Sequence, residues 1–527
     1  MANTYEKASD LPGKKKAVAT VAVFLALAEI LFFNAMARTV GPYITADLGD
    51  VSLFTMMNTI FFLCSTCVMP IACKLGDKFG RSRIILIGIA IYSASMLLAG
   101  LSTDMPMHVL FRGGQGLGQG CMLANCLTAI GEIHDGPARA KYLGLYGTVT
   151  GVCNIFGPTL GGIIYETMGW RAVFYTTIVV GIIVVALLLT MFPNIKKKSN
   201  SSIDVIGFVL MSLAAGCAVF AFSFVSARGW TDPLIICLLV VAVAAAVAFV
   251  VAENKAKNPI ISMKLFKNKY FVLCVIAACA IWPCMFSSNA YFTLYAQAIR
   301  GMSAIDSGAI LSAQAIVNTL AGIVVGFWIT ASKGRIRAIM IVIIALYAGS
   351  MVLQSTCNVE TPMWVLYVMM GIIGFGNGAV MGAFTAGIQG NVSSDEISSA
   401  TATLQSFQSL TGTIGLSIMG VVLNSSFTDK LATVVPSGLT DLVPMEQLTP
   451  YLNAGALINA QGANDFMASL PQAAQGLFQT MMSNVNAAYA SSLETVFIIL
   501  TCLLAIALIS MVLLKEKKTS TETEKAE

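Results

Sequence analysis

Long apolar runs separated by short polar connections form the main pattern along this chain of 527 residues. A helix needs about 20 apolar residues to cross the roughly 30 Å hydrocarbon core of a membrane. Fourteen runs of about this length are predicted to span a membrane, and they lie near residues 17–41, 51–73, 84–101, 106–131, 142–165, 172–193, 205–226, 234–252, 270–298, 307–331, 338–356, 362–389, 398–426 and 491–514. The pattern therefore predicts an all-α integral membrane protein with 14 transmembrane helices.

The basic residues test this count, because the cytoplasmic loops of membrane proteins collect Lys and Arg. With the N-terminus placed in the cytoplasm, 25 of the 31 Lys and Arg residues fall in connections on the cytoplasmic side. Four others lie in the opposite connections, and Arg38 and Arg112 lie within spans. We therefore expect a multi-pass protein of the cell (plasma) membrane with cytoplasmic N- and C-termini.

Composition narrows the class of protein further. Hydrophobic residues make up 57% of the chain and charged residues 11%, whereas an ordinary soluble domain has roughly 25% charged residues. The net charge of +5 follows from the loop distribution, so we expect the lipid bilayer as a partner and no nucleic acid. The only two histidines, His108 and His134, and the scattered cysteines form no ligand cluster. No metal or cofactor is expected, and we expect a monomer.

An internal repeat divides the chain. Aligning the segment that starts at Arg112 with the one that starts at Met370 superimposes four glycines in each, which are Gly113, Gly116, Gly118 and Gly120 on Gly371, Gly374, Gly376 and Gly378. Parallel repeats of six helices, with a substrate bound between them, are one architecture of membrane transporters. We predict a six-helix bundle over 1–194, a linker and inserted helix pair over 195–253, a second six-helix bundle over 254–515 with a long outer connection at 428–490, and a disordered cytoplasmic tail over 516–527.

Several motifs then resemble one family. The stretch "CKLGDKFGRSR" at 73–83 resembles the loop signature of the major facilitator superfamily, with Asp77, Gly80, Arg81 and Arg83 in place. "RGGQG" from Arg112 is similar to the superfamily's fourth-helix motif. "GVCNIFGPTLGG" at 151–162 resembles the fifth-helix motif associated with antiporters, with Gly151, Gly157, Pro158, Gly161 and Gly162 in place. "GWRAVF" at 169–174 is similar to the start of the sixth helix in the 14-helix drug/proton antiporter family.

The resemblance implies a transporter rather than an enzyme. It implies a proton-coupled antiporter that exports amphipathic small organic molecules, of the multidrug-efflux type, by alternating access. One alternative is a proton symporter or facilitator for an organic anion. A remote alternative is a non-transporting membrane receptor or enzyme, for which the sequence shows no catalytic or nucleotide-binding constellation.

Two motifs suggest moving parts. In the 73–83 loop, a carboxylate between arginines can pair across helix ends, so Asp77, Gly80, Arg81 and Arg83 are predicted to form a conformational latch; a simple cytoplasmic anchor is the alternative. In the fifth span, Gly157 and Pro158 interrupt the helical hydrogen bonds and the other motif glycines leave a smooth face. This helix is expected to seal one side of a cavity, with plain helix packing as the alternative.

Glu29 and Arg112 are the predicted proton-coupling pair. Glu29 lies near mid-depth of its span, and no other Asp or Glu lies so far from a span end. Arg112 matches the apolar Met370 in the repeat, so the shared fold does not require an arginine there. The alternatives are that Glu29 only neutralises Arg112 and that Arg112 clamps backbone carbonyls.

The first span departs from the family, because Arg38 stands where its motif has Asn. Arg38 favours an anionic or zwitterionic substrate if it lines the cavity, and snorkelling to the interface is the alternative. Arg38 and Glu29 are expected on opposite helix faces. The other substrate-binding candidates are polar or aromatic residues within spans, namely Asn34, Asn58, Gln115, Gln119, Asn154, Trp282, Asn289, Tyr291, Tyr295, Gln314 and Asn318.

Two further elements are predicted from local patterns. Pro283 is expected to break the ninth span and make it flexible. In the outer connection, apolar residues at helical spacing between Phe478 and Tyr489 predict a short amphipathic helix, lying on the membrane or over the cavity. The sequence leaves open the substrate, the proton stoichiometry and the role of this connection.

Overall fold

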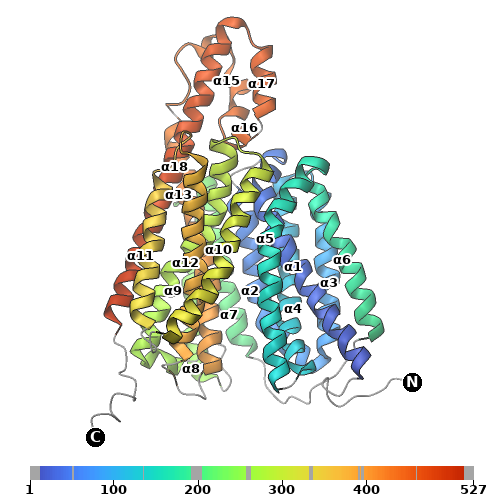
Figure 1. Ribbon diagram of the computed structural model, residues 1–527. Helices are drawn as coiled ribbons and strands as arrows, with labels where there is room; N and C mark the ends of the chain where they lie inside the picture. Colours follow the sequence, from blue (N-terminus) through green and yellow to red (C-terminus); the bar gives the residue numbers. More distant parts are fainter. Residues whose placement is uncertain are drawn as a thin grey trace.

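The computed structural model describes residues 12–49, 53–134, 136–191, 204–256, 261, 263–331, 336–389, 392, 397–431, 433–458 and 460–514, and the secondary structure within these ranges is helical. Long helices run side by side, and short helices project beyond them at one end (Figure 1). The first helix begins and the last helix ends at the opposite end of the bundle. We call these two ends the insertion end and the termini end.

The helices follow one another with short connections. The first group comprises α1 (Gly13–Asp47), α2 (Phe54–Phe79), α3 (Arg81–Gly100), α4 (Met105–Ile133), α5 (Gly136–Met168) and α6 (Trp170–Met191). Next come α7 (Val205–Arg228), α8 (Pro233–Lys255) and the short η3 (Met263–Lys267). The third group comprises α9 (Lys269–Leu294), the π-helical η4 (Tyr295–Ile299), α10 (Ala304–Ala331), α11 (Ile336–Ser355), α12 (Met363–Gln389), α13 (Ile397–Leu431) and α18 (Gln472–Leu513). The projecting part contains α14 (Leu439–Leu442), α15 (Met445–Leu448), η5 (Thr449–Tyr451), α16 (Ala454–Ile458) and α17 (Ala460–Ser469).

Thirteen helices of the described ranges are long and apolar enough to cross a membrane. The predicted fourth span, α4, is a helix of 29 residues but is not among them. Its polar residues explain this, because His108, Arg112, Gln115 and Gln119 all lie within it. The multi-pass architecture is confirmed, and the count of 14 spans stays a prediction.

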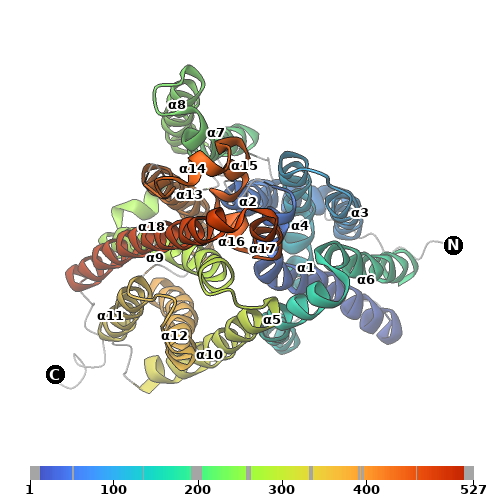
Figure 2. The same cartoon turned by 90° about the horizontal axis from the view of Figure 1, so that it is seen from above.

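The helices pack in two groups and an edge pair. Helices α1 to α6 pack mainly on one another, and α9 to α13 pack with α18. The pair α7 and α8 packs together at the edge, where α7 contacts α2 and α13 (Figure 2). We call the first group the N-terminal half and the second group the C-terminal half.

The repeated glycines make equivalent contacts in the two halves. A methyl group placed on Gly116 would lie 2.3 Å from the carbonyl oxygen of Phe61 in α2, and one on Gly374 would lie 2.4 Å from that of Gln314 in α10. The next pair behaves alike. A methyl group on Gly120 would lie 2.6 Å from the carbonyl oxygen of Ser65 in α2, and one on Gly378 would lie 2.0 Å from that of Asn318 in α10. These glycines therefore allow backbone to approach backbone between α4 and α2 and between α12 and α10.

Two local predictions are wrong. The helix α9 continues through Pro283, and regular α-helix ends only at Leu294, where η4 follows. Phe478 to Tyr489 do not form a separate helix, because α18 is one helix of 42 residues that begins at Gln472. Its first turns extend beyond the bundle, where Phe478 packs on Tyr451 and Phe466 of the projecting part, whereas Tyr489 packs on Phe427 of α13.

Candidate functional site

Glu29 is buried inside the N-terminal half. Its side chain is 3% exposed, and neither carboxylate oxygen has a hydrogen-bond partner among the described residues. The carboxylate of Glu29 faces Gly181 of α6 and Ser93 of α3. A methyl group on Gly181 would lie 2.8 Å from both Oε1 of Glu29 and Oγ of Ser93. The carboxylate therefore lies where α1, α3 and α6 meet. An ionised carboxylate without a hydrogen-bond partner is costly in such surroundings.

Arg112 lies close to this site but does not pair with Glu29 in the described structure. Its Nη1 donates a hydrogen bond to Oε1 of Gln115, one helical turn away, at 2.8 Å. The guanidinium lies 4.5 Å from the ring centre of Phe61 and 5.7 Å from that of Phe33. Its charge is therefore stabilised by an amide and by aromatic faces.

Tyr92 and Ser93 of α3 lie in the same region. The ring of Tyr92 is 6.3 Å from that of Phe33, which also faces Arg112, and the hydroxyls of Tyr92 and Ser93 are buried without a hydrogen-bond partner among the described residues. Nothing in the sequence marks Tyr92 and Ser93, because two hydroxyl residues within an apolar span carry no motif.

The opposite face of α1 has a different environment. Asn34 donates to Oε1 of Gln119 at 2.7 Å, and Gln119 donates onward to Ser65 at 3.3 Å. Arg38 follows Asn34 by one turn of α1 and is exposed. Asn34 contacts α4, and Ala35 contacts Gly157 of α5. Arg38 therefore lies on the face of α1 between α4 and α5. The space beside Arg38 is therefore not filled by side chains. The prediction that Glu29 and Arg38 lie on opposite faces is confirmed.

The 73–83 motif forms a compact polar cluster. Gly80, with φ of 98°, ends α2 and precedes α3, a conformation that favours glycine. Arg81 is 5% exposed, pairs with Asp77 and also lies 3.5 Å from Oε1 of Glu132 in α4. It donates to Oδ1 of Asn125 in α4 at 3.1 Å as well, while Arg83 is exposed. The motif thus joins α2, α3 and α4 at the termini end.

The motif glycines of α5 face two different helices. Methyl groups on Gly157 and Gly161 would lie 2.4 Å from Cβ of Ala35 and 2.9 Å from Cα of Met36 in α1. One on Gly162 would lie 2.6 Å from the carbonyl oxygen of Ala304 in α10, and Gly151 faces Thr319 of α10. The helix is uninterrupted at Pro158, whose carbonyl oxygen lies against Gly308 of α10. This helix therefore packs closely within its own half and across to the other.

Hydrogen bonds join the two halves near the insertion end. Gln297 of η4 donates to the carbonyl oxygen of Thr39 at 2.8 Å, and Tyr43 donates to that of Met302 at 3.2 Å. Further bonds across the halves are Thr55 to Tyr291, Thr159 to Ser312, and the backbone N–H of Ile305 to Glu166. The two halves are thus held together at this end.

The remaining substrate-binding candidates fall into different environments. Asn58, Asn154 and Asn289 each donate to a carbonyl of their own helix four residues earlier. Tyr291 bridges Thr55 and the carbonyl of Leu416, and Tyr295 donates to that of Asn358. Trp282 and Gln314 are buried, and Asn318 is half-buried. Asn34 bonds Gln119 and Gln115 bonds Arg112, so these candidates meet in pairs on α1 and α4.

Comparison with known proteins places these features in a family. Residues 21–416 match the Major Facilitator Superfamily. The chain is similar to the Multidrug transporter protein MdtP of Bacillus subtilis, with 30% identity over 458 residues that cover 86% of this chain and 82% of the relative. It is 28% identical to the Tetracenomycin C resistance and export protein of Streptomyces glaucescens, over 73% of this chain and 72% of the relative.

Solved structures show the same fold. A bacterial homologue of the human lysosomal transporter Spinster, in an inward-facing and unoccupied conformation, gives a TM-score of 0.63 at 14% identity and covers 97% of this chain and 100% of that chain. The nucleoside transporter NupG gives 0.59 at 14% identity, over 95% and 100% of the two chains. At these identities the likeness concerns the fold alone.

Proposed function

The chain belongs to the Major Facilitator Superfamily, and on this premise we propose that it is a proton-coupled antiporter that exports amphipathic small organic molecules by alternating access. The names of its relatives, a multidrug transporter and an antibiotic resistance and export protein, support drug efflux. The termini end would face the cytoplasm, and the protein would act as a monomer in the cell membrane.

The buried carboxylate of Glu29 is the observation that carries the proton coupling. Both of its oxygens lack a partner among the described residues, and Arg112 does not neutralise it directly. Such a group takes up a proton when it is dry and releases one when water or a cation approaches. A conformational change that alternates these conditions would couple proton movement to transport.

The other motifs have roles in the same cycle. In the proposed mechanism the Asp77–Arg81 pair, supported by Glu132, is a latch at the termini end that forms in one conformation and breaks in the other. The glycine face of α5 would let the halves close at the insertion end. In the conformation described here that end is held shut, so the substrate path would open toward the cytoplasm.

Proton release from purified protein tests the proposal. Adding a lipophilic substrate to lightly buffered protein should release protons, and Glu29→Gln should bind the substrate without releasing them, because the amide cannot ionise. Glu253→Gln is the control, since Glu253 is also 3% exposed but lies in α8, outside both halves, and accepts a hydrogen bond from Ile261. Full proton release, and full pH-gradient-driven transport, by Glu29→Gln would rule out this assignment.

A second candidate is a proton symporter or facilitator for an organic anion. The exposed Arg38, on the face of α1 between α4 and α5, favours it. Testing cations, anions and zwitterions in the same proton-release assay separates the two, because antiport predicts proton release on substrate binding and symport predicts proton uptake.

A further inference from the structure

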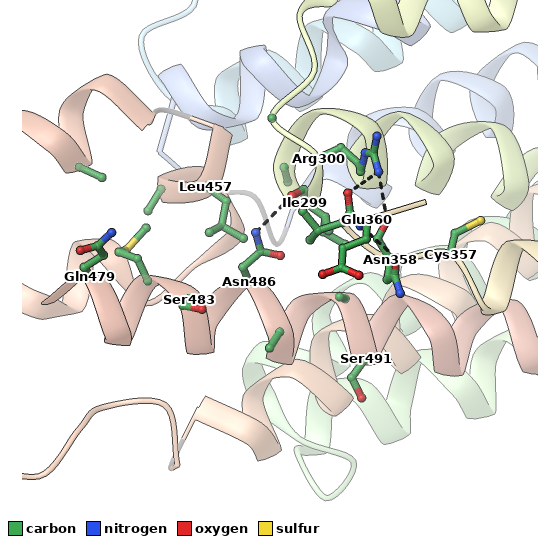
Figure 3. A pocket seen from close by; sticks show the side chains of 18 of the residues that line it. Ile299, Arg300, Cys357, Asn358, Glu360, Leu457, Gln479, Ser483, Asn486 and Ser491 are labelled. Carbon is green, nitrogen blue, oxygen red and sulfur yellow. Dashed lines mark hydrogen bonds between the residues drawn. The ribbon is translucent and has the colours of Figure 1, made fainter. Parts of the chain in front are cut away.

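A large open pocket lies at the insertion end, apart from the Glu29 region. Its volume is about 1100 Å³, which is ample for a drug-sized molecule. Its walls come from the start of α18, from α16 and α17, and from the connections α9–α10 and α11–α12. Figure 3 shows Gln479, Ser483 and Asn486 following one another along α18, with Arg300 and Glu360 beside them.

The pocket is unevenly charged. Arg300 is its only basic lining residue, and its guanidinium contacts the carbonyl oxygens of Asn358, Val359 and Thr361. The acidic lining residues, Glu360 and Glu494, are exposed, and their carboxylates make no hydrogen bond or ion pair with another described residue. The arginine is thus occupied by the wall itself, and the two carboxylates are free to meet a ligand.

The rest of the lining mixes polar side chains with apolar ones. Met467 and Met482 are partly buried and contribute a polarisable surface, and methionine adapts its shape to different partners. Phe478 also lines the pocket but is 1% exposed, because it packs on Tyr451 and Phe466. Carboxylates without a partner attract organic cations. Asn486 ties α18 to the pocket wall, because its Nδ2 donates to the carbonyl of Ile299 at 3.2 Å.

The floor of the pocket is the segment that holds the two halves together. Ala298, Ile299 and Arg300 line the pocket, and the adjacent Gln297 bonds Thr39 of the N-terminal half. This segment is a π-helical turn, a geometry common at functional sites. Contacts made in the pocket therefore act directly on the element that closes the insertion end.

We propose that this pocket is a second binding site, for lipophilic organic cations, distinct from any site between the two halves. A cation would lie against Met467 and Met482 with its charge toward Glu360 and Glu494. Its contact with η4 would link occupancy of the pocket to opening of the insertion end. This inference does not depend on proton coupling.

Protection of a single introduced cysteine tests the site in the full-length protein in nanodiscs, where both faces meet solvent. Cys357, which lines the pocket, and the exposed Cys237 and Cys502 are first replaced by serine, and this protein is the parent. Ser483 lines the pocket and is exposed, so Ser483→Cys should react with a maleimide faster than the parent protein does. Tetraphenylphosphonium should slow this reaction saturably, whereas tetraphenylborate, of the same shape and opposite charge, should not. Equal protection by both ions, or by neither, would overturn the proposal.

Charge-removing variants complete the test. Glu360→Gln combined with Glu494→Gln should raise the concentration for half-maximal protection roughly fivefold, as expected when two exposed carboxylates are lost. Glu446→Gln is the matched control, because Glu446 is an exposed glutamate of the same projecting region outside the pocket. The rate at which the introduced thiol reacts before ligand addition reports that each variant is folded and accessible. An unchanged half-protection concentration in the double variant would refute a cation site at these carboxylates.

Discussion

At the scale of single residues, α1 keeps two charges apart by placing them on opposite faces. Nine residues turn the helix by about two and a half turns, so Glu29 faces the interior of the N-terminal half and Arg38 faces away from it. Arg112 forms no ion pair with Glu29 in the described structure and donates to Gln115 instead. The carboxylate is left without a permanent counterion, as a group that exchanges protons requires.

Arg112 can be tested against its own repeat partner. Arg112→Met copies the buried Met370, so we expect normal membrane abundance but a fall of roughly tenfold in gradient-driven export, since the bond to Gln115 and the charge near Tyr92 are both lost. Arg112→Lys should be intermediate, because it keeps the charge but not the planar group that lies over Phe61. Export of an amphipathic dye from proteoliposomes measures both. Wild-type export by Arg112→Met would mean that the arginine is dispensable.

Periodicity and motif spacing predicted part of this site and could not predict the rest. The opposite faces of Glu29 and Arg38 follow from the helical repeat, and the Asp77–Arg81 pair follows from a carboxylate that stands among basic residues where two helices meet. Glu132, Asn125 and Tyr92 join these groups from other helices. Such contacts depend on how helices are rotated against each other, which a single helix's pattern does not contain.

At the scale of helices, glycine sets how close two backbones approach. The same contact recurs at Gly116 and Gly374, which explains why the glycine spacing is repeated in the two halves. Two glycines of α5 also recur in α13: methyl groups on Gly415 and Gly420 would lie 2.4 Å from Pro283 of α9 and 2.7 Å from Thr55 of α2, as Gly157 and Gly162 face α1 and α10. Proline is a weaker guide here, because both α5 and α9 continue through one. Neighbouring helices can compensate for the missing hydrogen bond within a membrane bundle.

The α5–α10 contact offers a matched pair of variants. Gly162→Val would place Cβ 2.6 Å from the carbonyl oxygen of Ala304, so overpacking should destabilise this closed conformation by about 1–3 kcal/mol, roughly a tenfold shift in population. Gly147→Val lies in the same helix with no atom within 4 Å and should leave the population unchanged.

Spin labels at Leu101 and Trp364, which are exposed at the insertion ends of the two halves, report the separation. The two exposed cysteines, Cys237 and Cys502, would first be replaced by serine. Longer distances in Gly162→Val and not in Gly147→Val are expected. Identical distance distributions in the two variants would contradict the role assigned to Gly162.

At the scale of the whole molecule, the two halves meet through a seam at the insertion end. The sequence predicted two repeated halves but not the end at which they would be joined. The free-energy difference between closing the insertion end and closing the termini end depends on contacts between the halves, such as Gln297 to Thr39 and Thr159 to Ser312. It also did not predict the outer pocket, since that surface requires the long α18 and two distant connections together. Alternating access requires this seam to open and close in every cycle.

Locking the seam should therefore stop transport. The hydroxyl oxygens of Thr159 and Ser312 are 2.8 Å apart, so a cysteine pair at these positions comes within reach of disulfide geometry between α5 and α10. Oxidation of Thr159→Cys with Ser312→Cys should abolish export in proteoliposomes, and reduction should restore it. The control pair, Ser426→Cys with Ser492→Cys, has hydroxyls 3.2 Å apart but joins α13 to α18 within the C-terminal half, so its oxidation should leave export intact. Continued export by the oxidised α5–α10 pair, with the disulfide confirmed by mass spectrometry, would show that transport does not require the halves to separate here.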